Sequence, residues 1–319
     1  MSKNISLGVV MDPIANIKPY KDSTFAMLLA AQERGWPIYY FEQSDLFIKD
    51  GVAWAKWRRL DLVDNTEKWF SFSEEGVSPV SEIVNAVLMR KDPPFDMEYI
   101  YSTYILEMAE QLGVLMVNKP QSLRDANEKL FTTQFSQCCT TTLVSRSMDD
   151  LRAFVTEHKD VIFKPLDQMG GASIYRVQPD DQNLSVILEN LTGMGTRCTM
   201  AQKFIPEISQ GDKRILIVDG EVIPYALARI PKDGETRGNL AAGGRAEGLP
   251  LTDRDFWICQ QISQTLKDKG LIFVGLDVIG DYLTEINVTS PTCIRELDEI
   301  YGLDIAGQLM DAIEARLAN

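Results

Sequence analysis

The chain has 319 residues, a length that predicts two or three domains. Hydrophobic residues make up 45% of it and charged residues 24%, which is the balance of a folded globular protein. Its 46 acidic residues outnumber the 32 basic ones, and the net charge of −14 disfavours nucleic acid and anionic membrane surfaces as partners. Since no run of 18 apolar residues occurs, the sequence predicts no membrane span.

The cysteine and histidine content disfavours several kinds of catalysis. The five cysteines form no C-x-x-C pair, and we expect the single histidine, His158, to be solvated in a polar turn after a helix. Zinc binding and Ser-His-Asp or Cys-His catalysis are therefore unsupported. The odd cysteine count, with Cys138 and Cys139 adjacent, is unlike a secreted disulfide framework, and we expect a cytoplasmic protein.

The first third of the chain alternates predicted strands and helices, which favours an open, largely parallel sheet. Strands are predicted at 5–10, 37–41, 86–89 and 114–117, and helices at 23–34 and 98–112. The dipeptide Asp50-Gly51 predicts a type I′ hairpin turn. Ser122, with Asp125 three residues later, resembles a capping box and predicts a helix through about Phe135, just after a domain boundary.

The pattern changes after residue 120. Strands are predicted at 141–145, 161–164, 173–177 and 200–205, hairpins at 213–229 and 272–287, and helices at 147–158, 253–269 and 303–317. The glycine-rich polar stretch 230–248 is long for a plain connection, and it fits either a mobile lid or a flexible linker.

The last predicted hairpin carries two carboxylates and an amide that suit a metal ion. Asp277 interrupts an apolar strand, and Glu285 and Asn287 share one face of the returning strand. A two-residue turn would pair Asp277 with Thr284 and place Glu285 on the other face of the hairpin, whereas a three-residue loop, 280–282, pairs the two carboxylates. We favour the longer loop, which converges the three side chains into a hard-oxygen site for Mg²⁺ or Mn²⁺. An exposed hairpin with solvated acids is the alternative.

Two lysines and a glycine turn are candidate phosphate ligands. Lys164 ends an apolar strand just before Pro165, and Lys129 lies on the helix predicted after the domain boundary. The turn with Gly170 and Gly171 offers backbone N–H groups to a phosphate, although it lacks the Walker A pattern. Taken alone, each signal also fits a surface lysine or a structural turn.

Three arginines at strand ends can hold carboxylates bidentately. Arg214 leads a charged cluster into an apolar strand, which predicts a place in an internal cleft, and Arg229 ends the partner strand. Arg90 ends the strand 86–89, where its Lys-Asp-Pro-Pro continuation also fits a rigid turn with solvated charges.

The order of these motifs resembles the ATP-grasp fold and, more closely, the bacterial-type glutathione synthetases. The motifs that carry this resemblance are MDPI at 11–14, LMRKDPPFD at 88–96, VNKP at 117–120, KPLD at 164–167, GDKR at 211–214, RGNLAAGG at 237–244 and LTEINVTSPT at 283–292. They span essentially the whole chain in order, and Gln168 departs from the glycine expected in many relatives.

The resemblance implies an α/β (α+β) fold, with an N-terminal Rossmann-like parallel-sheet domain (1–122) followed by a two-lobed ATP-grasp fold. The small lobe would be 123–204, and the large lobe 205–319 would carry a lid at 230–245. The implied enzyme is a ligase that forms glutathione from γ-L-glutamyl-L-cysteine and glycine. ATP would be consumed through an acyl phosphate, with release of ADP and phosphate. Relatives are commonly homotetramers, so we expect the same here.

The resemblance also implies a role for each matching residue. About two Mg²⁺ or Mn²⁺ ions would be held by Asp277, Glu285 and Asn287. ATP would contact Lys129, Lys164, Gly170, Gly171, Asp212 and the hinge Gln202, Lys203, Phe204 and Ile205. The substrates would contact Arg90, Arg214, Arg229, Asn287, Ser290 and Thr292. The catalytic residues would be Arg214, Arg237 and Arg245, the last two in a lid that keeps water from the acyl phosphate.

Three other functions fit parts of the pattern. One is a ligase for another acid–amine pair, such as D-alanine dimers or glutamate tails, although the lid and the Arg90 motif argue against it. A second is an ATP-binding regulatory module without turnover, which the complete set of lysines and metal ligands disfavours. The third, a Rossmann oxidoreductase, lacks its glycine fingerprint.

Overall fold

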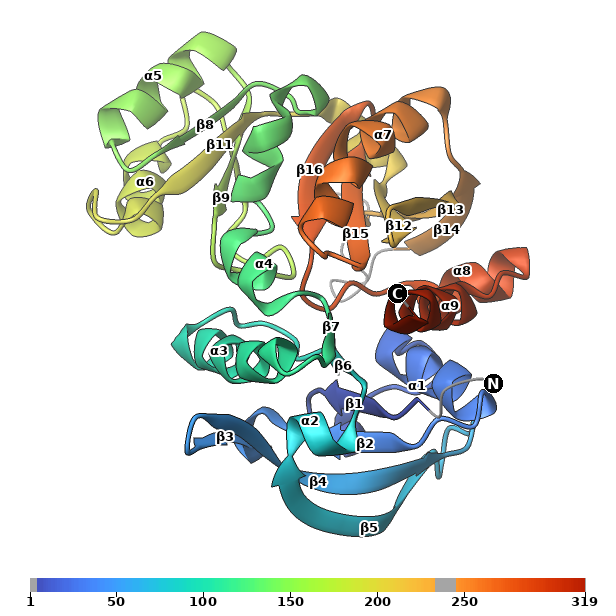
Figure 1. Cartoon of the computed structure of the whole chain (residues 1–319). Coiled ribbons are helices and arrows are strands. Elements are labelled where there is room, and N and C mark those ends of the chain that lie inside the picture. Colours follow the sequence, from blue (N-terminus) through green and yellow to red (C-terminus); the bar gives the residue numbers. More distant parts are fainter. Residues whose placement is uncertain (1–4, 233–244, 319) are drawn as a thin grey trace.

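Three β-sheets follow one another along the chain in the computed structural model, which describes residues 5–232 and 245–318 (Figure 1). The first sheet has the order β3-β4-β2-β1-β6-β7, with β5 beside β4. Its strands are β1 (Leu7–Val10), β2 (Ile38–Phe41), β3 (Leu46–Lys49), β4 (Val52–Leu62), β5 (Phe70–Pro79), β6 (Ala86–Met89) and β7 (Leu115–Val117). Strands β2, β1, β6 and β7 are parallel, which confirms the predicted Rossmann-like sheet.

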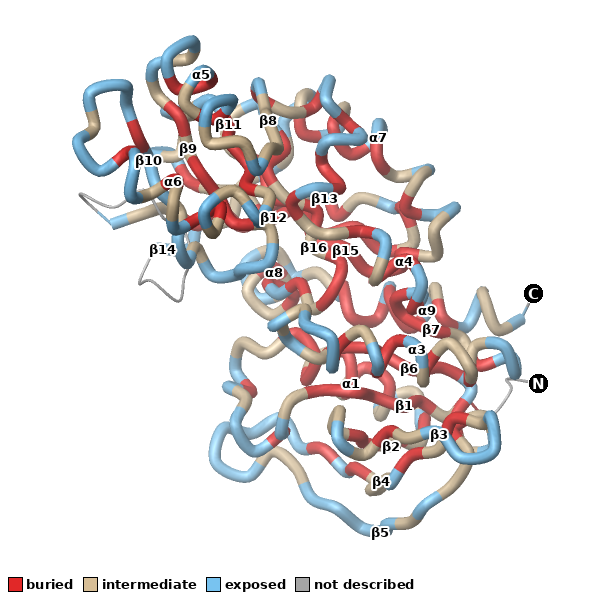
Figure 2. Tube along the Cα trace, turned by 90° about the vertical axis from the view of Figure 1, so that its left-hand side faces the viewer, coloured by how far each residue is buried: buried red, intermediate tan, exposed pale blue. Residues whose placement is uncertain are grey.

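Helices cover both sides of this first sheet and lead into the rest of the chain. They are α1 (Ser23–Glu33), α2 (Val80–Ile83), α3 (Met97–Gln111) and α4 (Pro120–Asp125). The four-residue parallel strands are wholly or almost wholly buried, whereas β5 is an exposed edge (Figure 2). The edge position explains why the polar sequence of β5 gave no strand signal.

The second sheet has the order β10-β9-β11-β8 and is antiparallel. Its elements are β8 (Thr142–Ser145), α5 (Met148–His158), β9 (Val161–Pro165), β10 (Tyr175–Val177), α6 (Leu184–Thr192) and β11 (Thr199–Lys203). Ser147 caps α5 as predicted, because its side chain accepts a hydrogen bond from the Asp150 amide. His158, expected to be solvated, is the last residue of α5 and stays partly exposed at 17%, while its ring packs on Phe154 with centroids 4.3 Å apart.

The third sheet has the order β14-β13-β12-β15-β16 and is also antiparallel. Its elements are β12 (Asp212–Val218), β13 (Glu221–Ile230), β14 (Arg245–Pro250), α7 (Asp253–Asp268), β15 (Phe273–Ile279) and β16 (Tyr282–Asn287), followed by α8 (Ile294–Tyr301) and α9 (Ile305–Ala318). Helices α8 and α9 return to α1, so one hydrophobic core joins the first sheet to the third (Figure 1).

Two predicted hairpin turns are confirmed by their backbone angles. Asp50 and Gly51 have φ values of 51° and 76°, and Asp219 and Gly220 have 48° and 79°. Positive φ at both central residues defines the type I′ turn. These local signals worked because the dipeptide alone supplies the unusual conformation.

The predicted helix from Ser122 to Phe135 is wrong. Pro120 starts α4 two residues earlier, and Ser122 instead donates a hydrogen bond to the carbonyl of Lys269. The Asn127 side chain then accepts from the amides of Lys129 and Leu130, which starts a separate 3₁₀ helix, Leu130–Cys138. An asparagine that bonds to the following backbone in this way competes with helix continuation.

Helix α7 is fastened to β12, the strand that carries Arg214, through a buried carboxylate. Asp255 is fully buried, pairs with the Lys213 ammonium and accepts from the amide and hydroxyl of Thr252. We expect Asp255→Ala to lower the free energy of unfolding by about 3–5 kcal/mol, because Lys213, whose side chain is 14% exposed, loses its buried counter-ion. Urea unfolding measures the loss. Asp253→Ala, an exposed change in the same helical turn, is the control, and an equal loss there would contradict this role for Asp255.

Candidate active site

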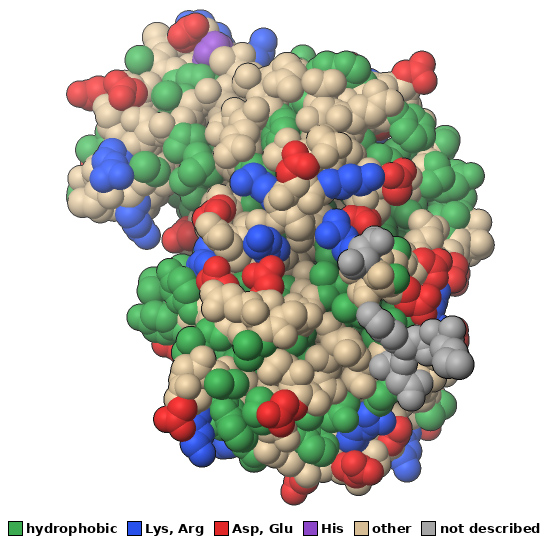
Figure 3. All heavy atoms as spheres, in the orientation of Figure 1, with side chains coloured by type: hydrophobic (Ala, Val, Ile, Leu, Met, Phe, Trp, Pro, Cys, Tyr) green, Lys and Arg blue, Asp and Glu red, His purple; other side chains and the backbone are tan. Residues whose placement is uncertain are grey.

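A cavity of about 500 Å³ lies where the three parts of the chain meet, lined by residues of the second and third sheets and by loops of the N-terminal part. Charged side chains of both signs gather around the hollowed middle of the face drawn in Figure 3. The third sheet forms one wall of the cavity, the second sheet another, and the loops before α1 and α3 close the N-terminal end.

The hairpin β15–β16 brings the predicted metal ligands onto one face. Asp277 pairs with Glu285, and Gly275 pairs with Asn287. The predicted three-residue loop is wrong, because Ile279 pairs with Tyr282 across a two-residue turn. A register shift between Asp277 and Val278 restores the convergence, with Thr284 as the extra residue of a β-bulge. The Thr284 hydroxyl donates to the Asp277 carbonyl at 3.1 Å.

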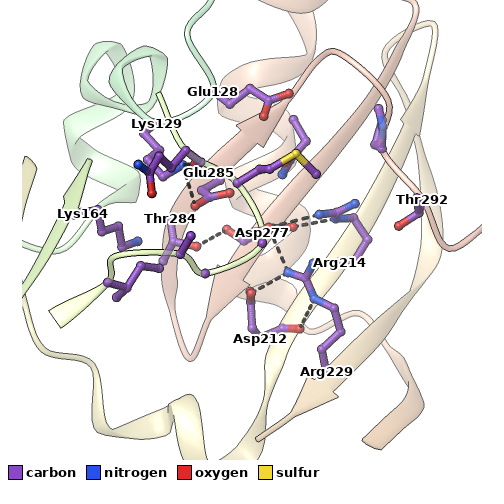
Figure 4. Close-up of a pocket in the computed structure, with 18 of the residues that line it drawn as sticks. Glu128, Lys129, Lys164, Asp212, Arg214, Arg229, Asp277, Thr284, Glu285 and Thr292 are labelled. Atoms are coloured by element: carbon purple, nitrogen blue, oxygen red, sulfur yellow. Dashed lines mark hydrogen bonds and ion pairs between the residues drawn. The ribbon is translucent and has the colours of Figure 1, made fainter. Parts of the chain in front are cut away.

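Asp277 is the centre of a buried ion network (Figure 4). Its Oδ1 lies 2.6 Å from Arg214 Nε, and its Oδ2 lies 2.9 Å from Arg229 Nη2. The Arg229 Nη2 also lies 2.5 Å from Asp212 Oδ2. Burial would raise the pKa of Asp277, but the two guanidinium groups outweigh it and hold that pKa below its usual range. The sequence did not predict that Asp277 is the counter-ion of both arginines.

Asp212 completes a set of carboxylates on this wall. Burial, reinforced by the neighbouring charges of Asp277 and Glu285 and opposed by Arg229, raises the pKa of Asp212 to about 7. Its Oδ1 is buried without a hydrogen-bond partner in the described structure. Such an orphaned oxygen beside two further carboxylates indicates a region in which a cation is needed.

The chemistry of these donors fits Mg²⁺ or Mn²⁺. The hairpin supplies only two carboxylates and an amide oxygen, and within 5–232 and 245–318 no cluster of three or more His, Cys, Asp or Glu side chains forms a ready metal site. Hard cations accept such sparse protein ligation when water and phosphate oxygens complete the coordination.

The two predicted phosphate lysines face the same cavity from the opposite side. Lys129 lies 3.6 Å from Glu285 and donates to the Gln168 carbonyl at 2.5 Å. Lys129 was predicted to lie on a helix, but it lies between the end of α4 and the 3₁₀ helix that starts at Leu130. Lys164 is buried on β9, and burial lowers its pKa while the Glu285 charge opposes that shift. Gly170 and Gly171 line the cavity next to Gln168 with φ values of 68° and 77°.

The predicted hinge lies at the end of β11. Gln202, Lys203, Phe204 and Ile205 all line the cavity. Gln202 donates to the Thr142 hydroxyl at 3.1 Å, and Arg176 stacks over the Phe204 ring at 3.7 Å. These contacts hold the connection between the second and third sheets in place.

The predicted substrate residues divide into two groups. Asn287, Ser290 and Thr292 line the cavity, and the Ser290 hydroxyl donates to Asp92. Arg90 does not line the cavity. It is buried beneath, where its guanidinium donates to the Thr24 hydroxyl at 3.0 Å and the Pro291 carbonyl at 2.9 Å. Through its hydrogen bond to the Pro291 carbonyl, Arg90 supports the loop that follows Asn287.

The structure describes only one of the two predicted lid arginines. Arg237 lies outside the described residues, as does most of the predicted lid. Arg245 starts β14, where its exposed side chain pairs with Glu247 at 3.2 Å and does not line the cavity.

Glu128 is a residue of the site that the sequence reasoning missed. Its buried carboxylate accepts hydrogen bonds from the Val288 amide at 3.0 Å and from the Thr289 amide and hydroxyl at 3.1 and 2.9 Å. Its carbonyl accepts from the Ile286 amide at 2.9 Å. Burial raises the pKa of Glu128, and the Thr289 hydrogen bonds oppose that shift. Only its adjacency to Lys129 could have marked it in the sequence.

We expect Glu128→Ala to lower both stability and kcat/KM. Three donors around residues 288–289 lose their acceptor, and hydrogen bonds to a charged group contribute about 1.5–3 kcal/mol each. The chain that carries Ser290 and Thr292 is then held less firmly, so we expect kcat/KM to fall about 10–100-fold. Thermal unfolding and steady-state kinetics measure the two effects. Glu128→Gln keeps one acceptor oxygen and should be intermediate in both; full activity of Glu128→Ala would refute this positioning role.

Known structures show which class of fold surrounds this site. D-cycloserine synthetase DcsG matches with a TM-score of 0.68 at 15% identity, covering 98% of this chain and 99% of that chain. The ATP-grasp ligase PsnB complexed with a minimal precursor matches with a TM-score of 0.66 at 19% identity, covering 99% of this chain and 100% of that chain. The fold is that of the ATP-grasp ligases, which confirms the predicted two-lobed architecture.

Sequence comparison identifies the family within this class. Residues 5–124 match the N-terminal domain of prokaryotic glutathione synthetase, and residues 128–302 match its ATP-grasp domain. The glutathione synthetase of Pseudomonas putida is 62% identical over 314 residues, and that of Escherichia coli K12 is 61% identical over 313 residues. Each alignment covers 98% of this chain and 99% of the relative. The chain belongs to the prokaryotic glutathione synthetase family, and it is an ATP-dependent ligase.

Proposed function

We propose that this enzyme joins γ-L-glutamyl-L-cysteine to glycine with ATP as co-substrate. The family supplies the reaction, and the observation that carries the assignment of residues is the cavity in which Lys129, Lys164, Arg214 and Arg229 face the hairpin carboxylates. A cysteinyl carboxylate oxygen attacks the γ-phosphorus, the bond from that phosphorus to the bridging oxygen breaks, and ADP leaves. The glycine nitrogen then attacks the acyl carbon, phosphate leaves, and the amine gives up a proton.

Bringing ATP and an anionic dipeptide together is the main electrostatic difficulty of this reaction. Lys164 and Lys129 hold the phosphates from the side of the second sheet. About two Mg²⁺ or Mn²⁺ ions, held by Asp277, Glu285 and Asn287, would neutralise charge on the β- and γ-phosphates. A solved structure of PsnB is described as a complex with Mg and ADP, which supports a metal–nucleotide pair for this fold.

Arg214 and Arg229 are suited to the charge that develops on the acyl phosphate. Asp277 and Asp212 fix both guanidinium groups before any substrate binds, so little reorganisation is needed during the reaction. Backbone groups of 202–205 hold adenine, and Ser290 and Thr292 contact the dipeptide. Arg90 acts through the Pro291 carbonyl and keeps this loop in position.

Two further expectations accompany this function. All five cysteines carry free thiols, which supports a reducing cytoplasm, and in the described part of the chain no helix is long and apolar enough to cross a membrane. As in other members of the family, we expect a homotetramer. Light scattering of the purified protein gives the mass that decides this point.

The test of the function is ADP release with Mg-ATP, γ-glutamylcysteine and glycine, each omitted in turn. Turnover that requires all three, with glutathione as product, is the expected result. Folded protein without turnover would make the chain an ATP-binding module, and turnover driven by D-alanine would make it a different ligase. Either outcome would contradict the proposal.

A further inference from the structure

The connection between the N-terminal part and the ATP-grasp part carries a buried amide that the reaction described above does not use. This connection passes from β7 to α4, between the first sheet and the third (Figure 1), and it contains the VNKP motif at 117–120. Within the motif, Asn118 is only 3% exposed. Buried amides are satisfied by hydrogen bonds, so the partners of Asn118 indicate what it does.

Asn118 joins the two strands of the hairpin β15–β16 at the end away from the turn. Its Nδ2 donates to the Phe273 carbonyl at 2.8 Å and to the Val288 carbonyl at 2.7 Å, and its Oδ1 accepts from the Phe273 amide at 2.9 Å. Phe273 is the first residue of β15, and Val288 directly follows β16. Because the last pair of the hairpin is Gly275 with Asn287, Asn118 links the strands just past the point where their own pairing ends.

The same connection holds Val288 from its other side. The Glu128 carboxylate accepts from the Val288 amide at 3.0 Å, whereas Asn118 donates to the Val288 carbonyl. Val288 is itself fully buried. Both backbone polar groups of this residue are therefore fixed, and the chain on either side of it is fixed with them. Asn287 lies on one side, and the loop that carries Ser290 and Thr292 lies on the other.

We propose that Asn118 is a positioning residue for the dipeptide, which acts through Val288 to set where Asn287, Ser290 and Thr292 lie in the cavity. A primary amide suits this task because it offers two N–H donors and an acceptor oxygen, which match two carbonyls and one amide. Asn118 itself does not line the cavity. The inference rests on the proposed function for the identity of the ligand, and it adds a residue that touches no substrate.

The nucleotide side of the cavity is built from other contacts. Lys164 and the hinge 202–205 belong to the second sheet and its end, whereas the hydrogen bonds of Asn118 all go to the ends of β15–β16. Loss of these bonds should therefore weaken the dipeptide and largely spare the nucleotide. A residue that only stabilised the fold would change neither affinity in protein that is still folded.

Calorimetry on the whole enzyme tests this split. It gives the Kd of Mg-bound adenylyl imidodiphosphate and then, in its presence, the Kd of γ-glutamylcysteine. We expect Asn118→Ala to weaken the dipeptide about tenfold or more and the nucleotide less than about threefold. Asn118→Asp keeps the acceptor for the Phe273 amide but places a carboxylate against two carbonyls, so it should weaken the dipeptide at least as much. Steady-state kinetics should show the same split between the KM values of the dipeptide and ATP.

Ser122→Ala is the matched control, because Ser122 lies in the same connection but donates to the Lys269 carbonyl just after α7. It should lower the unfolding temperature and alter neither Kd. Unchanged dipeptide affinity in Asn118→Ala, equal weakening of nucleotide and dipeptide, or the same dipeptide loss in Ser122→Ala would each overturn the assignment. Wild-type enzyme that does not bind the dipeptide would instead contradict the proposed function. If Asn118→Ala does not fold, the isosteric Asn118→Asp decides the question by itself.

Discussion

Asp277→Asn is expected to lower kcat/KM at least about 10³-fold, which corresponds to about 4 kcal/mol of lost transition-state stabilisation. The change removes a metal ligand, and it also removes the shared counter-ion of Arg214 and Arg229. With the carboxylate gone, two buried guanidinium groups repel each other and move from the positions in which they meet the acyl phosphate. Steady-state kinetics with all three substrates measures the loss.

The same variant should be less stable, since breaking a buried pair costs about 3–5 kcal/mol. Urea unfolding separates this effect from the kinetic one, provided that assays use conditions in which the variant is folded. Asp281→Asn, at the exposed turn of the same hairpin, is the matched control and should behave as wild type. A variant at position 277 with wild-type kcat/KM would show that the ion network is purely structural.

Lys164→Met is expected to weaken ATP binding about 100-fold, yet to raise stability without ligand. The ammonium is buried, and burial lowers the pKa of Lys164. A lysine whose folded pKa is depressed destabilises the fold at pH values below its unfolded pKa, so an apolar side chain of similar length removes that cost at pH 7. Phosphate binding loses a charge-assisted contact worth about 3 kcal/mol.

Calorimetric ATP titration and thermal unfolding test the two halves of this prediction. Lys56→Met, an exposed change on β4, should alter neither quantity. A less stable Lys164→Met would mean that the lysine is held by contacts in the empty enzyme, and unchanged ATP affinity would remove Lys164 from the phosphate site.

Local signals in the sequence predicted much of this fold. Asp50-Gly51 and Ser147 with Asp150 act over a few residues, and the structure shows the expected turn and cap. Helices α6 and α8 and strands β5 and β14 were missed. β5 is an exposed edge strand, and β14 begins inside the stretch interpreted as a loop, because sheet pairing with β13 overrides its polar composition.

The site shows where such reasoning stops. Convergence of Asp277 and Glu285 was predicted from alternation along strands, but the bulge at Thr284 that produces it depends on pairing across the hairpin. Likewise, Arg90 was expected to contact substrate because it ends a strand and because the resemblance implies that it holds a carboxylate of the dipeptide. Its burial under Pro291 depends on how the N-terminal domain packs against the third sheet, which no local pattern specifies.

Manganese binding tests the central claim most directly, namely that the hairpin carboxylates hold the cation that lets two anions meet. Electron paramagnetic resonance counts free Mn²⁺ during titration of the enzyme with adenylyl imidodiphosphate. For wild type we expect about two bound ions per chain, and for Glu285→Gln at least one site weakened about tenfold or more. Nucleotide-dependent Mn²⁺ binding that is the same in Glu285→Gln and wild type would contradict the account.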